Sequence, residues 1–140
     1  MNRNAIYDAL MALGSGVTGS FGGFVDTGRR LKLWDQAQFP ALYQVEPDDM
    51  VTSHLGTLPK RELKVTWVIY HAVGKDQSST PARTTSDMID AVEAVFPVVA
   101  AYQTLGGLVH AAFIDGTIKK FEGDLDGQTI ITIPITLLVP

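Results

Sequence analysis

The chain has 140 residues, of which 46% are hydrophobic and 19% charged, and this composition is typical of one folded domain rather than a disordered chain. Eleven basic residues against fifteen acidic residues give a net charge of −4, which argues against a protein that works by gripping phosphate backbones. The absence of cysteine excludes disulfides and cysteine-based zinc or thiol chemistry. We expect residues 1–140 to form a single domain.

The amino-terminal stretch predicts a short helix with one buried face. Ile6, Leu10 and Leu13 lie at helical spacing and form an apolar stripe. Asn4 is a suitable N-cap for this helix. Gly14 and Gly16 are expected to end it, because glycine tolerates the left-handed conformation that follows a last turn.

We do not expect this stretch to be a signal sequence, because Asp8 interrupts its apolar part, and the printed sequence has no run of about 18 apolar residues to cross a bilayer. We expect a protein that is made and kept in the cytoplasm until it joins something larger, without a membrane partner.

Residues 17–27 are dominated by Gly, Ser, Thr and Phe and predict a loop or irregular strand. The surrounding letters GSGVTGSFGG suggest a phosphate cradle, but they lack the lysine of a P-loop and the strand that precedes a dinucleotide motif. We favour a flexible connection anchored by Phe21 and Phe24.

Three strands are predicted between residues 29 and 73. Alternating polar and apolar residues predict short strands at Arg29–Trp34 and Ala41–Glu46. The clearest alternation is in Lys60–Val73, where every second residue is apolar: Leu63, Val65, Trp67 and Ile69. The other face begins polar and turns apolar at Val68 and Tyr70. We therefore expect a long central strand, half solvated at its start and covered on both faces at its end.

An acidic segment precedes that strand. Glu46, Asp48 and Asp49 lie close to His54, and carboxylates with a histidine can bind a metal or exchange protons. Two prolines and a glycine punctuate the segment, so we favour a solvated loop.

A connection as long as Glu46–Pro59 without its own structure is usually functional or disordered. We expect a docking loop that is loose in the free protein and ordered on assembly. Its apolar contacts would come from Met50, Val51 and Leu55.

A polar linker, Gly74–Arg83, separates the central strand from a second helix. The helix is predicted by an apolar stripe and is ended or interrupted by Pro97. Its stripe consists of Met88, Ile89, Val92, Val95 and Phe96, and its candidate caps are Thr84, Thr85 and Ser86.

The last third predicts a long hairpin. Val109–Phe121 reads as a strand bent around Asp115–Gly116, and Asp124–Gly127 (DLDG) is a turn signal. This turn has the letters that begin a calcium loop, but it lacks the flanking helices and the glutamate at the twelfth position. Gln128–Val139 is the last strand, and Pro134 predicts that it is an edge strand or bulged.

These elements predict an α+β fold, in which a mostly antiparallel sheet of four to five strands carries two helices on one face. The three histidines, His54, His71 and His110, have no serine, thiol or paired carboxylate at a telling spacing. We therefore expect no catalytic residues, no metal and no cofactor.

Several segments, in this order, resemble the tail terminator proteins (tail completion, minor tail protein U type) of long-tailed bacteriophages and prophages. They are IYDALMAL, RRLKLWDQ followed by FPALYQVE, LPKRELKVTWVIY and QTLGGLVHAAFIDGTIKKFEGDLDGQTIITIPITLLVP. The resemblance covers nearly the whole chain except Ser15–Thr27 and Lys75–Arg83. It implies a hexameric ring on the end of the tail tube, which stops tube polymerisation and offers a surface to the head–tail connector. The implied partners are other copies of the chain, the tube protein and the connector, at the head-proximal end of the tail.

Rotational symmetry requires that one patch of a subunit meet a different patch on the next. We expect basic residues to face acidic ones across that contact, with apolar neighbours completing a subunit or tube interface. The candidates are Arg29, Arg30, Lys60, Arg61, Glu46, Asp48, Asp49, Asp124, Met50 and Leu55. An acidic ring also suits a channel through which DNA slides without specific binding.

Two other function classes are open to the sequence. A tail tube or connector subunit would share these features, but a tube subunit would polymerise into filaments instead of stopping at a ring. An enzyme or a small metal- or ligand-binding module would use the region from Glu46 to His54.

Overall fold

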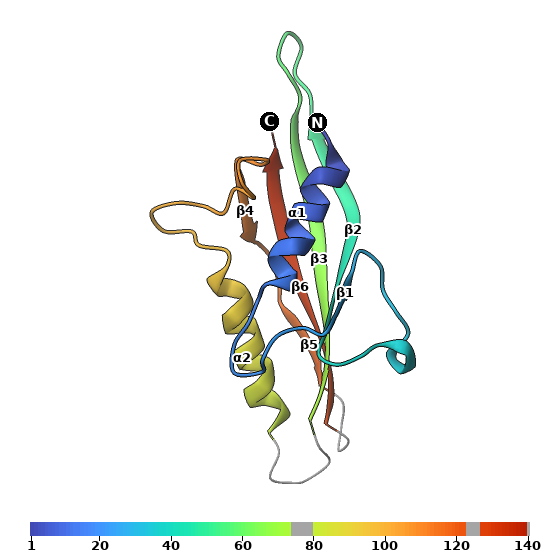
Figure 1. The fold of residues 1–140 in the computed structure, drawn as a ribbon. Coiled ribbons are helices and arrows are strands. Elements are labelled where there is room, and N and C mark those ends of the chain that lie inside the picture. The colour runs from blue at the N-terminus through green and yellow to red at the C-terminus, as the bar shows by residue number, and fades with distance from the viewer. Residues whose placement is uncertain (74–79, 123–126, 140) are drawn as a thin grey trace.

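The computed structural model describes residues 1–73, 80–122 and 127–139. Two helices and six strands occur in these residues, together with one short 3-10 turn (Figure 1). In chain order they are α1 (Arg3–Ser15), β1 (Asp26–Gly28), η1 (Trp34–Gln36), β2 (Ala41–Thr52), β3 (Lys60–Ala72), α2 (Pro81–Ala94), β4 (Ala111–Ile114), β5 (Lys119–Glu122) and β6 (Gln128–Val139).

The strands form one sheet in the order β1-β2-β3-β6-β4, and β5 pairs with β6 beside β4. All pairs are antiparallel except β1 with β2. The predicted α+β class is therefore confirmed, but the sheet is mixed and has six described strands rather than four or five. The parallel pair was missed because β1 has only three residues, too few for a periodic signal.

The predicted central strand is confirmed. β3 pairs with β2 on one side and with β6 along its whole length on the other. Its apolar face is almost completely buried, with Leu63, Trp67 and Ile69 at 0% exposure. The opposite face changes from partly exposed at Glu62 to buried at Tyr70.

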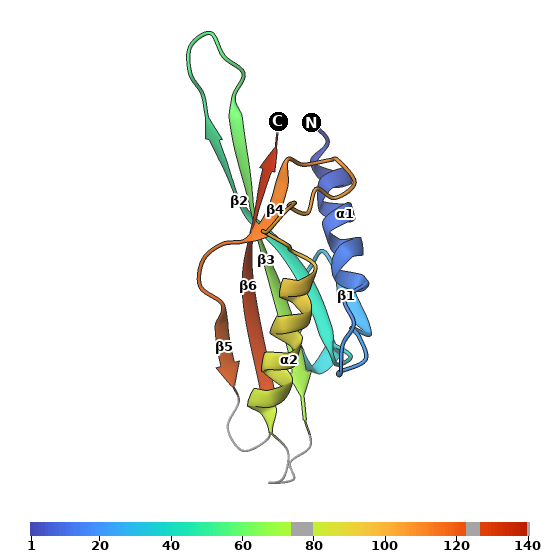
Figure 2. The same cartoon turned by 90° about the vertical axis from the view of Figure 1, so that its left-hand side faces the viewer.

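The main core lies between the sheet and the two helices, which cover the same face (Figures 1 and 2). Leu10 of α1 and Val92 of α2 are both fully buried there with Trp67 of β3. A second, smaller cluster lies on the opposite face, where Trp34 packs on Tyr70 with ring centroids 5.1 Å apart. The segment before β2 covers that part of the sheet.

The strand predicted at Arg29–Trp34 is wrong. Its residues leave the sheet after β1 and end in the 3-10 turn η1. Two polar residues of the alternating pattern form ion pairs that hold this segment to the sheet: Arg29 with Glu46 and Lys32 with Asp26. The apolar residue Trp34 packs on the sheet face instead of entering a ladder.

The predicted stripe of α1 holds, but its ends differ. Asn2, not Asn4, caps the helix, because the Asn2 Oδ1 atom accepts a hydrogen bond of 3.1 Å from the Ala5 N–H. Gly14 lies inside the helix and is buried, and the cap residue Gly16 has a φ of −89°, which is not left-handed. Gly14 is needed for close packing rather than for ending the helix.

The second helix begins earlier than its predicted caps at residues 84–86. Thr80 is the N-cap and Pro81 the first helical residue, a position where proline's fixed φ is favourable. The end at Ala94, three residues before Pro97, agrees with the prediction. Residues 74–79 of the predicted linker and residues 123–126 of the predicted DLDG turn lie outside the described residues.

The strand predicted at Val109–Phe121 is divided into β4 and β5. Pro134 of β6 lies opposite the break, where the Asp115 N–H donates to the Pro134 carbonyl at 3.1 Å. β6 is therefore inside the sheet rather than at its edge. The missing N–H of Pro134 falls where the neighbouring strand is interrupted, so no ladder bond is lost.

The predicted loop Glu46–Pro59 is largely a hairpin. β2 continues to Thr52, and only residues 53–59 lie between the two strands. A bulge between Val45 and Asp48 accommodates Pro47, after which pairing resumes with Asp48 opposite Lys64. Pro47 and the acidic residues favour a loop locally, but pairing with the long strand β3 keeps residues 48–52 in the sheet.

The contact between α1 and the sheet generates a stability prediction. A Cβ atom at Gly14 would lie 2.5 Å from Leu42 Cδ2 and 3.1 Å from the Trp67 ring. Gly14→Ala should lower the free energy of unfolding by about 1–3 kcal/mol, because overpacking outweighs the roughly 1 kcal/mol that alanine gains in a helix. Urea unfolding measures this. Gly16→Ala is the matched control, since its Cβ has ordinary contacts; equal stability of the two variants would contradict the packing argument.

Candidate functional site

The region proposed as a metal or proton-transfer site does not gather its ligands. Among the described residues no three of His, Asp and Glu lie close enough together to hold a metal ion. Glu46 and Asp49 are each paired with an arginine, and about 20 Å of strand separates Glu46 from Thr52, short of His54 at the tip. In the same described part of the chain, no helix combines the length and apolar character needed to cross a membrane.

The main external feature is a hairpin arm, residues 48–64, formed by the ends of β2 and β3. It projects beyond the N-terminus and beyond the end of β6 (Figures 1 and 2). Within the arm, residues 61–64 of β3 still pair with β6, and the last described pair is Arg61 with Val139, so the part that projects is the outer part of the hairpin. Four large apolar side chains are more than half exposed on the arm: Met50, Val51, Leu55 and Leu58. Leu55 at 106% and Leu58 at 89% have almost no contact with their own chain, and this clustered exposure makes the arm the candidate interaction surface.

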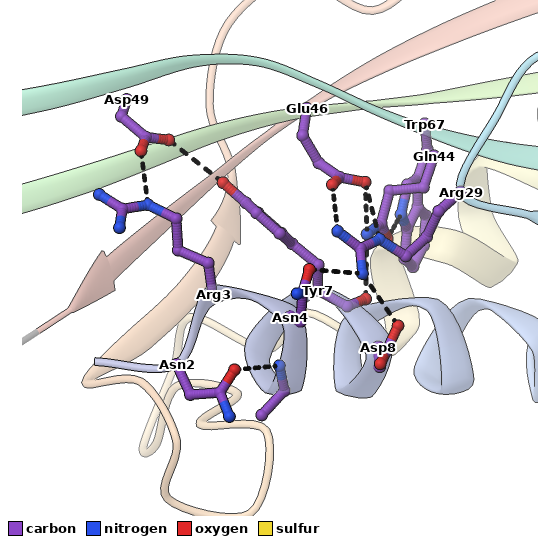
Figure 3. A network of polar contacts seen from close by, with 11 residues as sticks. Asn2, Arg3, Asn4, Tyr7, Asp8, Arg29, Gln44, Glu46, Asp49 and Trp67 are labelled. Atoms are coloured by element: carbon purple, nitrogen blue, oxygen red, sulfur yellow. Dashed lines mark hydrogen bonds and ion pairs between the residues drawn. The ribbon is translucent and has the colours of Figure 1, made fainter.

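The base of the arm is attached to α1 (Figure 3). Arg3 Nε lies 2.7 Å from Asp49 Oδ2, and the Tyr7 hydroxyl donates to Asp49 Oδ1 at 3.2 Å. Burial, together with the Asp49 carboxylate, raises the pKa of Tyr7 to about 12. The phenol therefore remains a proton donor to Asp49 at neutral pH.

A second ion pair lies on the other side of the bulge. Arg29 Nη2 and Nε contact the two oxygens of Glu46 at 2.6 and 3.2 Å, and Nη1 contacts Asp8 at 3.1 Å. The guanidinium also lies 5.1 Å from the centroid of the Tyr7 ring. The hydrogen bond to Glu46 raises the pKa of Arg29 above its ordinary value. This two-point contact fixes orientation as well as adding energy.

A buried amide joins this ion pair to the core. Gln44, at 0% exposure, accepts from Trp67 Nε1 at 3.0 Å. Its Nε2 donates to the Tyr7 carbonyl at 3.0 Å and to Glu46 Oε2 at 3.3 Å. The direction in which the arm leaves the body is therefore set by contacts that begin at the central tryptophan.

On the sheet face opposite the helices there is a hollow, which we name the side groove. It has a volume of about 440 Å³, and it is lined by Arg30, Leu31, Lys32, Leu33, Trp34, Gln36 and Tyr70. Leu31 and Leu33 are 47% and 72% exposed. The groove therefore presents apolar side chains beside an exposed arginine.

Asp26 holds the groove in place. Its carboxylate accepts from the Tyr43 hydroxyl at 2.7 Å, from Lys32 Nζ at 3.0 Å and from the Gln38 N–H at 3.3 Å. The Tyr43 hydrogen bond, followed by that of Lys32, keeps the pKa of Asp26 below its ordinary value. The Tyr70 hydroxyl also donates to the Lys32 carbonyl at 3.0 Å.

The predicted interface residues fall into three places. Arg29 and Glu46 pair with each other beside the bulge, Arg30 lines the side groove, and Asp124 lies outside the described residues. The arm carries the remainder: Asp48, Asp49, Met50, Leu55, Lys60 and Arg61. Arg29, Glu46 and Asp49 already have partners within their own chain.

Sequence reasoning missed Leu58 on the arm and the apolar residues of the groove. In RRLKLW, the leucines were counted as one face of a strand. One signal in the sequence was the proline of FPALYQVE, which lies directly before β2 and so separates RRLKLW from that strand. RRLKLW folds over the sheet face, where Trp34 packs.

No family model matches the chain, and no curated protein matches it. A solved structure whose name conveys no function is similar to this chain, with a TM-score of 0.55 and 18% sequence identity. The match covers 98% of this chain and 96% of the other. It shows that the fold is shared over essentially the whole length.

A double-mutant cycle tests the arm's attachment. Arg29→Met and Glu46→Gln should show a coupling free energy of roughly 1–3 kcal/mol in urea unfolding, because the pair is two-pronged and largely shielded from water. The pair Glu62–Lys64, changed to Gln and Met, is the control. It has a single contact and a more exposed carboxylate (44% against 18% for Glu46), so it should couple by at most about 1 kcal/mol. Equal coupling in the two cycles would mean that the buried contacts of Arg29 add nothing.

Asp26 gives a pH prediction. Because its pKa is lowered in the folded state, the stabilisation is complete above the ordinary value of 3.8 and is lost as the pH falls through the lowered pKa. Asp26→Asn should therefore be less stable than the wild type by about 1–3 kcal/mol at pH 7, and the difference should shrink in acid. Unfolding curves at a series of pH values measure this. Asp35→Asn, which removes an exposed carboxyl of the same segment, is the control for the general effect of removing one negative charge. A stability difference for Asp26→Asn that stays constant as the pH falls would refute the assignment.

Proposed function

We propose that this protein is a structural virion assembly protein that forms a ring, of six chains, on the end of a phage tail tube. The ring ends tube polymerisation and provides the surface for head–tail joining. The observation that carries the proposal is the hairpin arm, whose apolar tip is exposed although its base is firmly attached to the body.

The energetics of the tip support a partner. Burying one leucine side chain stabilises a complex by about 1.5–3 kcal/mol relative to leaving it in water. Leu55 and Leu58 make almost no contact with their own chain, so nearly all of this gain is available on assembly. An attached base also lowers the ordering cost, because a pre-formed arm loses less conformational freedom than a loop.

The resemblance of the ordered segments to tail terminators selects ring formation among the possible assemblies. A tube or connector subunit is the alternative, and it would use the same arm. The two differ in outcome, since a terminator stops at a closed ring while a tube subunit adds copies without limit. A metal- or ligand-binding module has less support, because the carboxylates near the bulge are engaged by arginines.

The arm generates an assembly prediction. The double variant Leu55→Ser, Leu58→Ser should fold with the wild-type melting temperature, because both side chains are exposed. Its association should be weakened at least roughly a hundredfold, from the loss of two buried leucines. Native mass spectrometry over a concentration series, with and without tube ends, measures ring formation.

Val25→Ser is the matched control, since Val25 is 60% exposed but lies away from the arm. A wild-type protein that stays monomeric even with tube ends present would refute the proposed function. Filaments without a closed species would favour the tube subunit. If the double variant still formed normal rings, the tip of the arm would not be part of the contact between subunits.

A further inference from the structure

We propose that the hairpin arm of one copy docks in the side groove of the next copy, so that each subunit both gives an arm and receives one. This inference rests on the proposed self-association and adds to it the two surfaces that meet. It follows from complementary features of the arm's tip and the groove, both of which are exposed in the part of the chain that the structure describes.

The apolar surfaces match in kind. The arm presents Leu55 and Leu58 at its tip, and the groove presents Leu31 and Leu33 beside the ring of Trp34. A hollow of about 440 Å³ falls within the range of roughly 300–1,000 Å³ of sites that enclose a bound group. The tip, residues 50–59, carries no carboxylate, lysine or arginine, so it can enter an apolar hollow without desolvating a formal charge.

The charges beside these surfaces are opposite. Asp48 is exposed at the start of the arm, and Arg30 is exposed at the rim of the groove. Neither forms an ion pair with another residue in the described parts of the chain. Asp48 lies opposite Lys64 on the sheet face that does not carry the helices, the face on which the groove also lies. An Asp48–Arg30 pair between copies would set the register of the docked arm.

An arm cannot reach the groove of its own chain. The arm leaves one end of the sheet (Figures 1 and 2). The groove is lined by Tyr70, which pairs with Ala41 at the start of β2, whereas the arm lies at the other end of β2, where Thr52 pairs with Lys60. The contact is therefore between copies and joins two different patches. Contacts of this kind close into a ring when the rotation between subunits permits.

A second apolar surface competes for the arm. Val98, Val99, Tyr102 and Leu108 are exposed in the segment that joins α2 to β4. Residues 97–108 contain no charged side chain, so this surface offers nothing to pair with Asp48. The charge at Arg30 therefore selects the side groove.

Cysteine cross-linking tests the contact directly, because the natural chain has no cysteine. Leu55→Cys and Leu33→Cys, prepared as separate variants and mixed under mild oxidation, should give a covalent dimer of one chain of each kind. Mass spectrometry distinguishes it from dimers of either variant with itself. The doubly substituted chain should give a ladder that ends at the size of the closed ring. Leu55→Cys mixed with Val99→Cys is the matched control and should link at least tenfold more slowly.

Charge reversal is the second measurement. Asp48→Arg or Arg30→Asp alone should raise the protein concentration at half-assembly roughly tenfold or more, and the two together should restore it. Arg30 is exposed, so Arg30→Asp should keep the wild-type melting temperature. Asp48→Arg places a cation opposite Lys64 and should lower the melting temperature slightly, so assembly is compared well below it.

The outcomes separate this inference from the proposed function. Rings that link through Val99 but not Leu33, or that link through neither, would overturn the docking site while leaving ring formation intact. Failure of the double charge reversal to restore assembly would also overturn it. A wild-type chain that never associates would overturn both proposals. Preferential linking of Leu55 to Leu33, with mutual rescue of the charges, supports the arm-in-groove contact.

Discussion

The structure depends on the close contact between α1 and the middle of β3. Gly14 leaves no room between the helix and the ring of Trp67, and the buried indole donates its N–H to Gln44. From that amide, hydrogen bonds continue to Glu46 and through it to Arg29. One tryptophan thus joins the apolar core to the polar contacts that orient the arm. A buried polar network of this kind stabilises one arrangement because each group left unpaired would carry a desolvation cost.

These contacts divide the molecule into a well-packed body and an exposed extension. Below the bulge, both sides of β2 and β3 are covered by helices, strands or the segment before β2. Above it, β3 keeps its β6 partner as far as Arg61 and Leu63 stays buried, while the apolar side chains of residues 50–58 are exposed to water. Stability is therefore served by the residues of the body, so substitutions at the exposed tip can leave the fold unaltered.

Much of the fold could be predicted from period-two alternation and helical stripes, which are strong where one face is buried, as in β3, β6 and α2. The predictions failed where a partner distant in sequence decides the structure. Pro47 and its acidic neighbours favour a loop locally, but pairing with β3 extends β2 past them. The segment's apolar residues could therefore be recognised from its composition, but the hairpin that exposes them could not. The groove could not be predicted, because it exists only when Trp34 reaches Tyr70.

The two interruptions in the outer strands bear on how this sheet meets other chains. On one side, the bulge with Pro47 leaves only a short stretch of β2 beyond it; on the other, the break opposite Pro134 leaves β4 and β5 with four residues each. Each free run of backbone donors and acceptors is thus too brief for stable strand addition, a common protection against aggregation. A chain with such edges is selective about its neighbours, because recognition must come from side chains, which distinguish one surface from another, and not from the backbone, which does not.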